Sequence, residues 1–245
     1  QLRKANLRLD GLEKMIRDMS AQLTEKKNDA AVNRMYGQTQ TVQENADGQQ
    51  ITLTVLDEYK SLYNQNKNLI GWLEIADTNI DYPVMQTADN EYYLDHNINQ
   101  EEDKNGTLFL DSACDVVKPS TNFIIYGHNM RSGNMFGNLD KYKSESYYKD
   151  HPMIRFDTIY EKGTYQVMYA FMSHIYKEDE IAFKYYQFID AASEQEFDSD
   201  MRSMQEMALY DTGVTAQYGD RLLTLSTCDY EESDGRFVVV AKRME

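Results

Sequence analysis

The sequence is poor in cysteine, in basic residues and in long apolar runs, and each shortage excludes a class of protein. Only two cysteines, Cys114 and Cys228, occur among 245 residues, whereas a secreted domain held together by disulfides usually carries more. No CxxC pair and no group of histidine and cysteine with zinc-binding spacing is present. We therefore expect neither a bound metal nor a cofactor.

Basic residues are outnumbered. Lys and Arg total 25 against 41 Asp and Glu, so the formal net charge is −16. A nucleic-acid-binding protein needs a dense basic surface to neutralise phosphates. The charge therefore argues against a nucleic-acid partner.

Apolar residues do not gather into a run of roughly 18, the length that a membrane-spanning helix needs, and no signal peptide is evident. The chain begins at Gln1 rather than at Met. We expect that an N-terminal targeting or anchor segment has been left out of it.

Residues 1–50 differ in composition from the remainder. Apolar residues recur there at alternating spacings of three and four, which predicts an amphipathic helix of about three heptads. They are Leu2, Ala5, Leu9, Leu12, Ile16, Met19 and Leu23. This stripe can pack against the main domain or against a second copy. Residues 24–50 are polar and predict a linker, so we place the domain boundary near residue 50 and the main domain at 51–245.

The main domain is rich in short apolar segments separated by turn residues. Eight of them predict strands: 69–75, 80–85, 106–111, 122–128, 153–158, 164–175, 222–227 and 237–241. Helices are expected at 55–66, 135–150 and 193–209, the last opened by Ser193 and Glu196 as a capping box. Strands that mostly lack crossover helices favour a mainly β fold, a closed or nearly closed barrel with peripheral helices.

Three residues at predicted strand ends carry reactive chemistry. Cys228 ends one strand, and Arg236 opens the strand that pairs with it as a hairpin. His128 ends a third strand after Gly127, which allows a close backbone approach. A thiol, an imidazole and a guanidinium are the parts of a cysteine acyl-transfer site, in which the cations stabilise the thiolate and the oxyanion.

Each of these residues also has a structural interpretation. Cys228 can be a small buried hydrophobic residue, or it can form a disulfide with Cys114. Arg236 can form weak surface ion pairs with acidic residues of the 229–235 loop. His96, His151 and His174 compete with His128 for the role of base: we expect the end of a helix for His96, a turn before Pro152 for His151, and the barrel wall for His174.

Two motifs resemble those of a known family. Tyr126-Gly-His128 and Thr224-Leu-Ser-Thr-Cys228, followed by Arg236 at the start of a strand, are similar to the sortases, the cysteine transpeptidases of Gram-positive cell surfaces. The likeness covers roughly residues 53–243. The long insertion before the cysteine strand and the N-terminal helix resemble class B, as do the segments 122–130 and 135–139.

The resemblance implies a sortase-type eight-stranded barrel in which His128, Cys228 and Arg236 converge. The Cys228 thiolate would attack the Thr carbonyl of an Asn-Pro-x-Thr-x sorting signal on a surface protein. The acyl group would then pass to an amine of a peptidoglycan precursor or of a pilin. It also implies a membrane anchor that precedes this chain, and a place on the outer face of the cytoplasmic membrane or in the cell wall.

The resemblance further implies residues that contact the sorting signal. They are Asn90, Leu94, Ser226, Thr227 and Ile181. Two other functions remain open on the sequence alone. The same site can serve a cysteine hydrolase that uses water as the acceptor, and the barrel with its N-terminal helix can serve as a non-catalytic surface assembly module.

Overall fold

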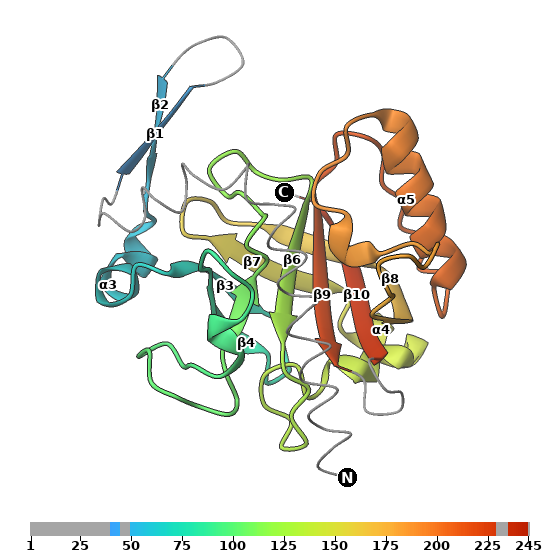
Figure 1. Cartoon of the computed structure of the whole chain (residues 1–245), viewed down its shortest axis with the longest axis horizontal. Helices are drawn as coiled ribbons and strands as arrows, with labels where there is room; N and C mark the ends of the chain where they lie inside the picture. Colours follow the sequence, from blue (N-terminus) through green and yellow to red (C-terminus); the bar gives the residue numbers. More distant parts are fainter. Residues whose placement is uncertain (1–39, 45–49, 229–234, 245) are drawn as a thin grey trace.

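The computed structural model describes residues 40–44, 50–228 and 235–244. The helix expected at residues 1–23 lies outside these residues. The described part forms a two-stranded hairpin, an eight-stranded barrel and helices around the barrel (Figure 1).

Eight strands close into a barrel in the order β10-β8-β7-β3-β4-β5-β6-β9, which confirms the mainly β class. Their bounds are β3 Leu69–Glu74, β4 Asp81–Met85, β5 Leu108–Leu110, β6 Asn122–Gly127, β7 Met153–Thr158, β8 Thr164–His174, β9 Leu222–Cys228 and β10 Gly235–Arg243. All eight coincide with predicted strands. Neighbours pair antiparallel except β4 with β5 and β6 with β9, which are parallel.

The remaining elements lie between and around these strands. They are α3 Asp57–Gln65, α4 Glu145–Asp150, α5 Glu194–Met207 and the 3₁₀ helices η2 Tyr92–Leu94, η3 Leu139–Lys143 and η4 Tyr185–Gln187. Strands β1 Gln40–Glu44 and β2 Gln50–Thr54 form an antiparallel pair that stands clear of the barrel (Figure 1). Our interpretation of residues 24–50 as a linker did not include β1.

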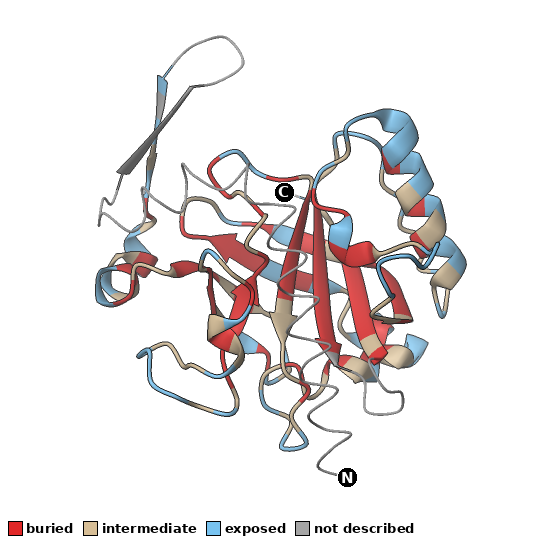
Figure 2. Ribbon diagram, viewed as in Figure 1, coloured by how far each residue is buried: buried red, intermediate tan, exposed pale blue. Residues whose placement is uncertain are grey.

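Two apolar cores sit on opposite faces of β9 and β10. Alternate residues such as Leu223, Leu225 and Phe237 pack in the barrel interior. Their neighbours Leu222 and Val238 pack in a second core on the outer face. The insertion between β8 and β9 covers that outer face with α5 and η4. In Figure 2 these strands are coloured as buried, and α5 carries exposed residues along its length. Strand alternation therefore assigns each residue to one of two different environments.

The single helix predicted for 135–150 is wrong. Met135 has a positive φ of 53°, and the Phe136 N–H donates to the His128 carbonyl over 2.9 Å, which closes the loop between them. A right-handed helix cannot run through the left-handed backbone of Met135, so only η3 and α4 form, after this loop. At α5 the Ser193 hydroxyl accepts from the Glu196 N–H as expected, but the Glu196 carboxylate accepts from the Ala192 N–H rather than from that of Ser193.

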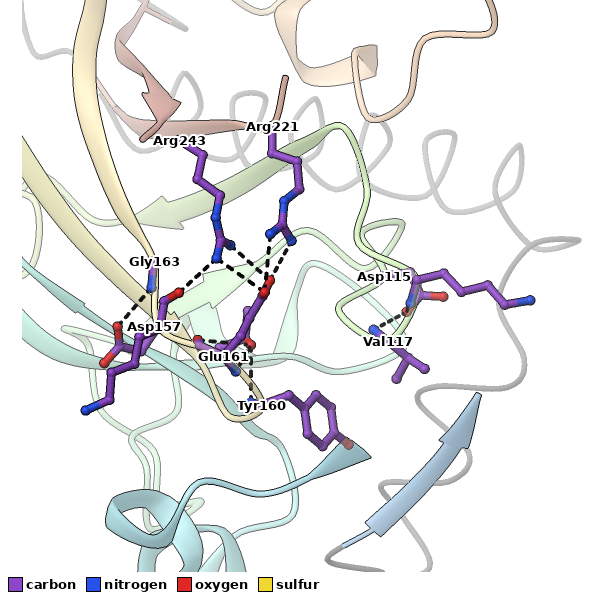
Figure 3. A network of polar contacts seen from close by, with 11 residues as sticks. Asp115, Val117, Asp157, Tyr160, Glu161, Gly163, Arg221 and Arg243 are labelled. Atoms are coloured by element: carbon purple, nitrogen blue, oxygen red, sulfur yellow. Dashed lines mark hydrogen bonds and ion pairs between the residues drawn. The ribbon is translucent and has the colours of Figure 1, made fainter. Parts of the chain in front are cut away.

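Ion pairs at the start of β9 and the end of β10 join these strands to the turn between β7 and β8 (Figure 3). Glu161, in the turn between β7 and β8, accepts hydrogen bonds from Arg221, before β9, and from Arg243, the last residue of β10. Burial alone would raise the pKa of Glu161, but the Arg221 and Arg243 guanidinium groups outweigh it and hold that pKa below its usual value. The three side chains join both strand ends to the β7–β8 turn.

Across the described residues, we find no helix that is both long and apolar enough to span a bilayer.

The substitution Glu161→Gln tests whether these ion pairs stabilise the fold. A carboxylate with a lowered folded pKa stabilises the fold above its unfolded pKa, near 4.5, and loses that contribution as the pH falls through the folded value. We expect the variant to lose about 1–2 kcal/mol of unfolding free energy at pH 7, a value reduced for the partial exposure of the pair. The difference from wild type should shrink as the pH falls below 4.5, measured by urea unfolding at a series of pH values.

Glu58→Gln is the matched control. Glu58 pairs with Lys162 at 2.9 Å on the exposed surface, and we expect its substitution to cost under about 0.5 kcal/mol. Equal losses from the two variants at pH 7 would contradict a special role for Glu161.

Candidate active site

The register of three neighbouring strands sets the position of the candidate site. Parallel β6 and β9 pair up to Gly127 with Thr227, so the next residues, His128 and Cys228, follow at the same level. Antiparallel β10 pairs Arg236 with Cys228. Neighbouring strands lie about 4.8 Å apart, so the structure brings His128, Cys228 and Arg236 into one row across three strands.

On β9 and β10, the backbone positions of this row have the parity that faces outward from the barrel. Positions on β9 alternate, and Leu223 and Leu225 pack inward while Ser226 faces the insertion, where its hydroxyl lies 2.7 Å from that of Tyr185. Cys228 occupies the next position of the same parity as Ser226. Arg236 has the parity of Val238, which packs in the outer core.

The His128 ring is held by a main-chain group. Its Nε2 atom lies 2.6 Å from the Leu94 carbonyl oxygen. Because a carbonyl oxygen can only accept, this contact assigns the proton to Nε2 in both the neutral and the charged ring. Nδ1 is then the nitrogen that can gain and lose a proton.

Gly127 is needed for the close packing beside His128. A Cβ at this position would overlap the side chains of Leu108 and Phe136. The absence of a side chain at Gly127 therefore lets Leu108 and Phe136 pack against the backbone, as expected from the sequence.

Arg236 is half-buried, and its Nη1 donates to the Gly235 carbonyl over 2.8 Å. Tyr186 of the insertion lies near enough for the two groups to interact: burial raises the pKa of Tyr186, and the Arg236 charge opposes this rise. The insertion thus supplies one side of the surroundings of the guanidinium.

The other three histidines do not belong to this row. His96 stacks on Tyr92 with ring centres 4.1 Å apart, and His151 ends α4, before Pro152, with its Nδ1 3.1 Å from the Tyr147 carbonyl. His174 ends barrel strand β8, as expected, where it pairs with Gly235 next to Arg236, and its side chain is 42% exposed.

Cys114 is a free, buried thiol whose Sγ lies 3.4 Å from the Asn122 carbonyl. Asn122 pairs with Leu222, at the opposite end of β9 from Cys228. A disulfide between the two cysteines, left open by the sequence, is therefore excluded by the separation. Burial raises the pKa of the Cys114 thiol well above its usual value, so this thiol is unreactive.

The residues expected to contact the substrate do not all lie beside the row of His128, Cys228 and Arg236. Leu94 touches the row through its carbonyl, and Ser226 lies on the row's face two positions from Cys228. Thr227 is buried on the opposite face, paired with the inward Phe237. Ile181 is fully exposed on the insertion.

Asn90, by contrast, is buried among polar partners that the sequence analysis missed. It contacts the carboxylate of Asp111, which also accepts a hydrogen bond from Tyr126. Tyr126 pairs with Ser226 and precedes His128 by two positions. Strand parity could have identified Tyr126, whereas Asp111 gave no signal beyond its place after an apolar strand.

The family model of the sortase domain matches residues 73–244. Sortase B of Listeria monocytogenes is 35% identical over 193 residues, which cover 77% of this chain and 74% of that protein. Sortase B of Staphylococcus aureus is 31% identical over 190 residues, 77% of this chain and 75% of that protein.

Solved structures of sortase B are also similar to this chain. The Staphylococcus aureus sortase B–substrate complex superposes with a TM-score of 0.70 at 30% identity, over 78% of this chain and 86% of that one. Sortase B from B. anthracis in complex with AAEK1 gives 0.70 at 30% identity, over 98% and 99%.

A barrel of this topology, with histidine, cysteine and arginine level with one another at one edge of three neighbouring strands, is that of a cysteine transpeptidase, an enzyme that takes sorting-signal substrates and an amine nucleophile. The chain belongs to the sortase family, and its relatives place it in class B, enzymes of the Gram-positive cell envelope.

The bond between Tyr185 and Ser226 ties the insertion to the floor of the site, and it can be tested by a double-mutant cycle. Tyr185→Phe and Ser226→Ala should each destabilise the protein by about 1–3 kcal/mol, because each leaves a buried hydroxyl without this partner. The double variant should cost clearly less than the sum, with a coupling of about 1 kcal/mol in urea unfolding. Strict additivity would show that the two hydroxyls do not interact.

Proposed function

We propose that this enzyme cleaves a C-terminal sorting signal of the Asn-Pro-x-Thr-x type after its threonine and transfers the threonine carbonyl to an amine of a peptidoglycan precursor. The observation that carries the proposal is the row of His128, Cys228 and Arg236 at the end of three neighbouring strands. The resemblance of the chain to class B sortases supplies the substrate class.

In the first half-reaction the Cys228 thiolate attacks the threonine carbonyl carbon, and the carbonyl electrons move onto oxygen. The Arg236 guanidinium, always charged, stabilises this oxyanion. The oxyanion then collapses, the C–N bond breaks, and protonated His128 delivers its proton to the leaving amine. A thioester on Cys228 and a neutral imidazole remain.

In the second half-reaction the acceptor amine attacks the thioester carbon. Neutral His128 takes the proton that the amine loses, the C–S bond breaks, and a new amide forms. The Leu94 carbonyl supports this exchange, because it holds the proton on Nε2 and leaves Nδ1 to give and take the proton. The cysteine thiolate and the imidazolium are regenerated together.

Substrate contacts belong to the same proposal. Leu94, Ser226 and Asn90 border the outer face along which a peptide would reach Cys228. Ile181 extends this border along the exposed insertion. Thr227 would act from beneath, through the backbone that precedes Cys228, since it faces the interior.

We place this reaction on the outer face of the cytoplasmic membrane of a Gram-positive bacterium, where an N-terminal anchor would hold the enzyme next to its surface-protein substrates. A pilin amine is the other acceptor compatible with this chemistry.

Cys228→Ala should abolish cleavage of a fluorogenic Asn-Pro-x-Thr-x peptide, because alanine has no thiol that can attack the threonine carbonyl. Cys114→Ala is the matched control and should keep wild-type turnover, because its buried thiol lies outside the site. Arg236→Lys should lower kcat by about 10²–10³-fold, because an ammonium does not reproduce the guanidinium fork. Equal turnover by wild type and Cys228→Ala would refute the proposal.

The acceptor is tested by adding an amine to the same reaction. Triglycine or diaminopimelate should divert the acyl group into a ligated product seen by mass spectrometry, at the expense of the hydrolysed peptide. A solved structure of a sortase B complexed with triglycine motivates the first of these. Hydrolysed peptide alone, at every amine concentration, would mean that the enzyme is a hydrolase.

A further inference from the structure

Asp111, directly after β5, carries a carboxylate that is almost completely buried, with the residue 1% exposed. Its Oδ2 accepts hydrogen bonds from the Asn90 side chain over 3.1 Å and from the Tyr126 hydroxyl over 2.9 Å. Its Oδ1 accepts from the Ala113 N–H over 2.8 Å. A buried carboxylate costs free energy unless donors surround it, so this cluster is a built feature of the fold.

The Asn90 amide is fixed in one orientation by this carboxylate. Nδ2 faces Asp111, which can only accept, and Oδ1 accepts from the Ser112 N–H over 2.8 Å, which can only donate. The two contacts exclude the flipped amide. Nδ2 bonds to Asp111 through one of its two hydrogens, which leaves the second hydrogen for another acceptor.

Two other buried polar atoms beside Asp111 lack partners within the described part of the chain. They are Ser112 Oγ and Gln86 Oε1, while Gln86 Nε2 donates to the Asp111 and Cys114 carbonyls over 2.8 Å each. Buried polar atoms in native proteins are nearly always satisfied. Both atoms are out of reach of a peptide, whereas the second hydrogen of the Asn90 amide is left for an acceptor outside the cluster.

This cluster is continuous with the catalytic row. Tyr126 links Asp111 to β6 two residues before His128, and it pairs in register with Ser226, two residues before Cys228. Burial, followed by the Asp111 charge, raises the pKa of Tyr126 well above its usual value, so its hydroxyl stays a donor to Asp111. From Asn90 the chain also leads to Leu94, whose carbonyl holds His128.

We propose that Asp111 is a positioning residue for peptide binding: it holds the Asn90 amide so that the free N–H donates to a backbone carbonyl of the sorting signal. This inference rests on the proposed function. Asp111 itself does not touch the peptide or the reacting atoms.

The test is Asp111→Asn, assayed for KM and kcat with the fluorogenic peptide. The substitution keeps the shape but presents an amide that can turn a donor toward Asn90 and release its orientation. We expect KM to rise about tenfold with kcat within about twofold, since the lost contact serves binding rather than chemistry. Asn90→Ala should raise KM to a similar extent, and the double variant should add little.

Tyr165→Phe is the matched control. Tyr165 also carries a buried hydroxyl without a partner among the described residues, but it lies on β8 toward Arg243, at the far end of the barrel. Its KM should equal that of wild type. The folded, active fraction of each variant is counted by alkylation of Cys228.

A purely structural role would lower the active fraction of Asp111→Asn and leave KM unchanged, which would overturn the inference. If Asp111→Asn does not fold, Asn90→Leu takes its place, because it removes the amide and leaves the carboxylate with its other donors; an unchanged KM there overturns the inference equally. Absence of turnover by the wild-type enzyme would instead refute the proposed function.

Discussion

The parallel pairing of β6 with β9 is the constraint on which the site depends. It joins segments about a hundred residues apart in the sequence and sets His128 level with Cys228. The adjoining antiparallel pair adds Arg236 at the same level. Side chains alternate along a strand, so a slip of β9 by one residue would turn the cysteine position toward the barrel interior. The chemistry therefore requires a register that is correct to a single residue.

Two kinds of interaction secure that register. The apolar cores on opposite faces of β9 and β10 each accept only residues of one parity, so a slip would bury polar side chains and expose apolar ones. At the end remote from the cysteine, Glu161 binds the arginines that flank the two strands. The insertion is attached through Tyr185 and Ser226. The strands that carry the site, β9 and β10, are therefore stabilised by apolar cores on both faces, by ion pairs at the end remote from Cys228 and by the Tyr185–Ser226 bond nearer to it.

Sequence reasoning predicted all eight barrel strands because each is a short apolar segment between turn residues, and it predicted the ends that carry His128 and Cys228. It could not supply the register, because pairing between distant segments leaves no local periodicity. It also missed the turn near Met135, where tertiary contacts override helix propensity. Asp111 was missed because an aspartate after a strand is usually a surface residue. The catalytic and substrate-binding roles remain predictions that activity measurements can decide.

The contact between His128 and the Leu94 carbonyl has an evolutionary consequence. A main-chain oxygen is present whatever side chain residue 94 carries, so no single codon change at that position can delete the acceptor. Drift at residue 94 can alter shape and polarity while the imidazole tautomer is inherited unchanged. Substitutions at residue 94 can therefore change the surface near His128 while the acid–base chemistry of the imidazole is retained. Removing the hydrogen bond itself would require replacement of the peptide linkage, for example by an ester.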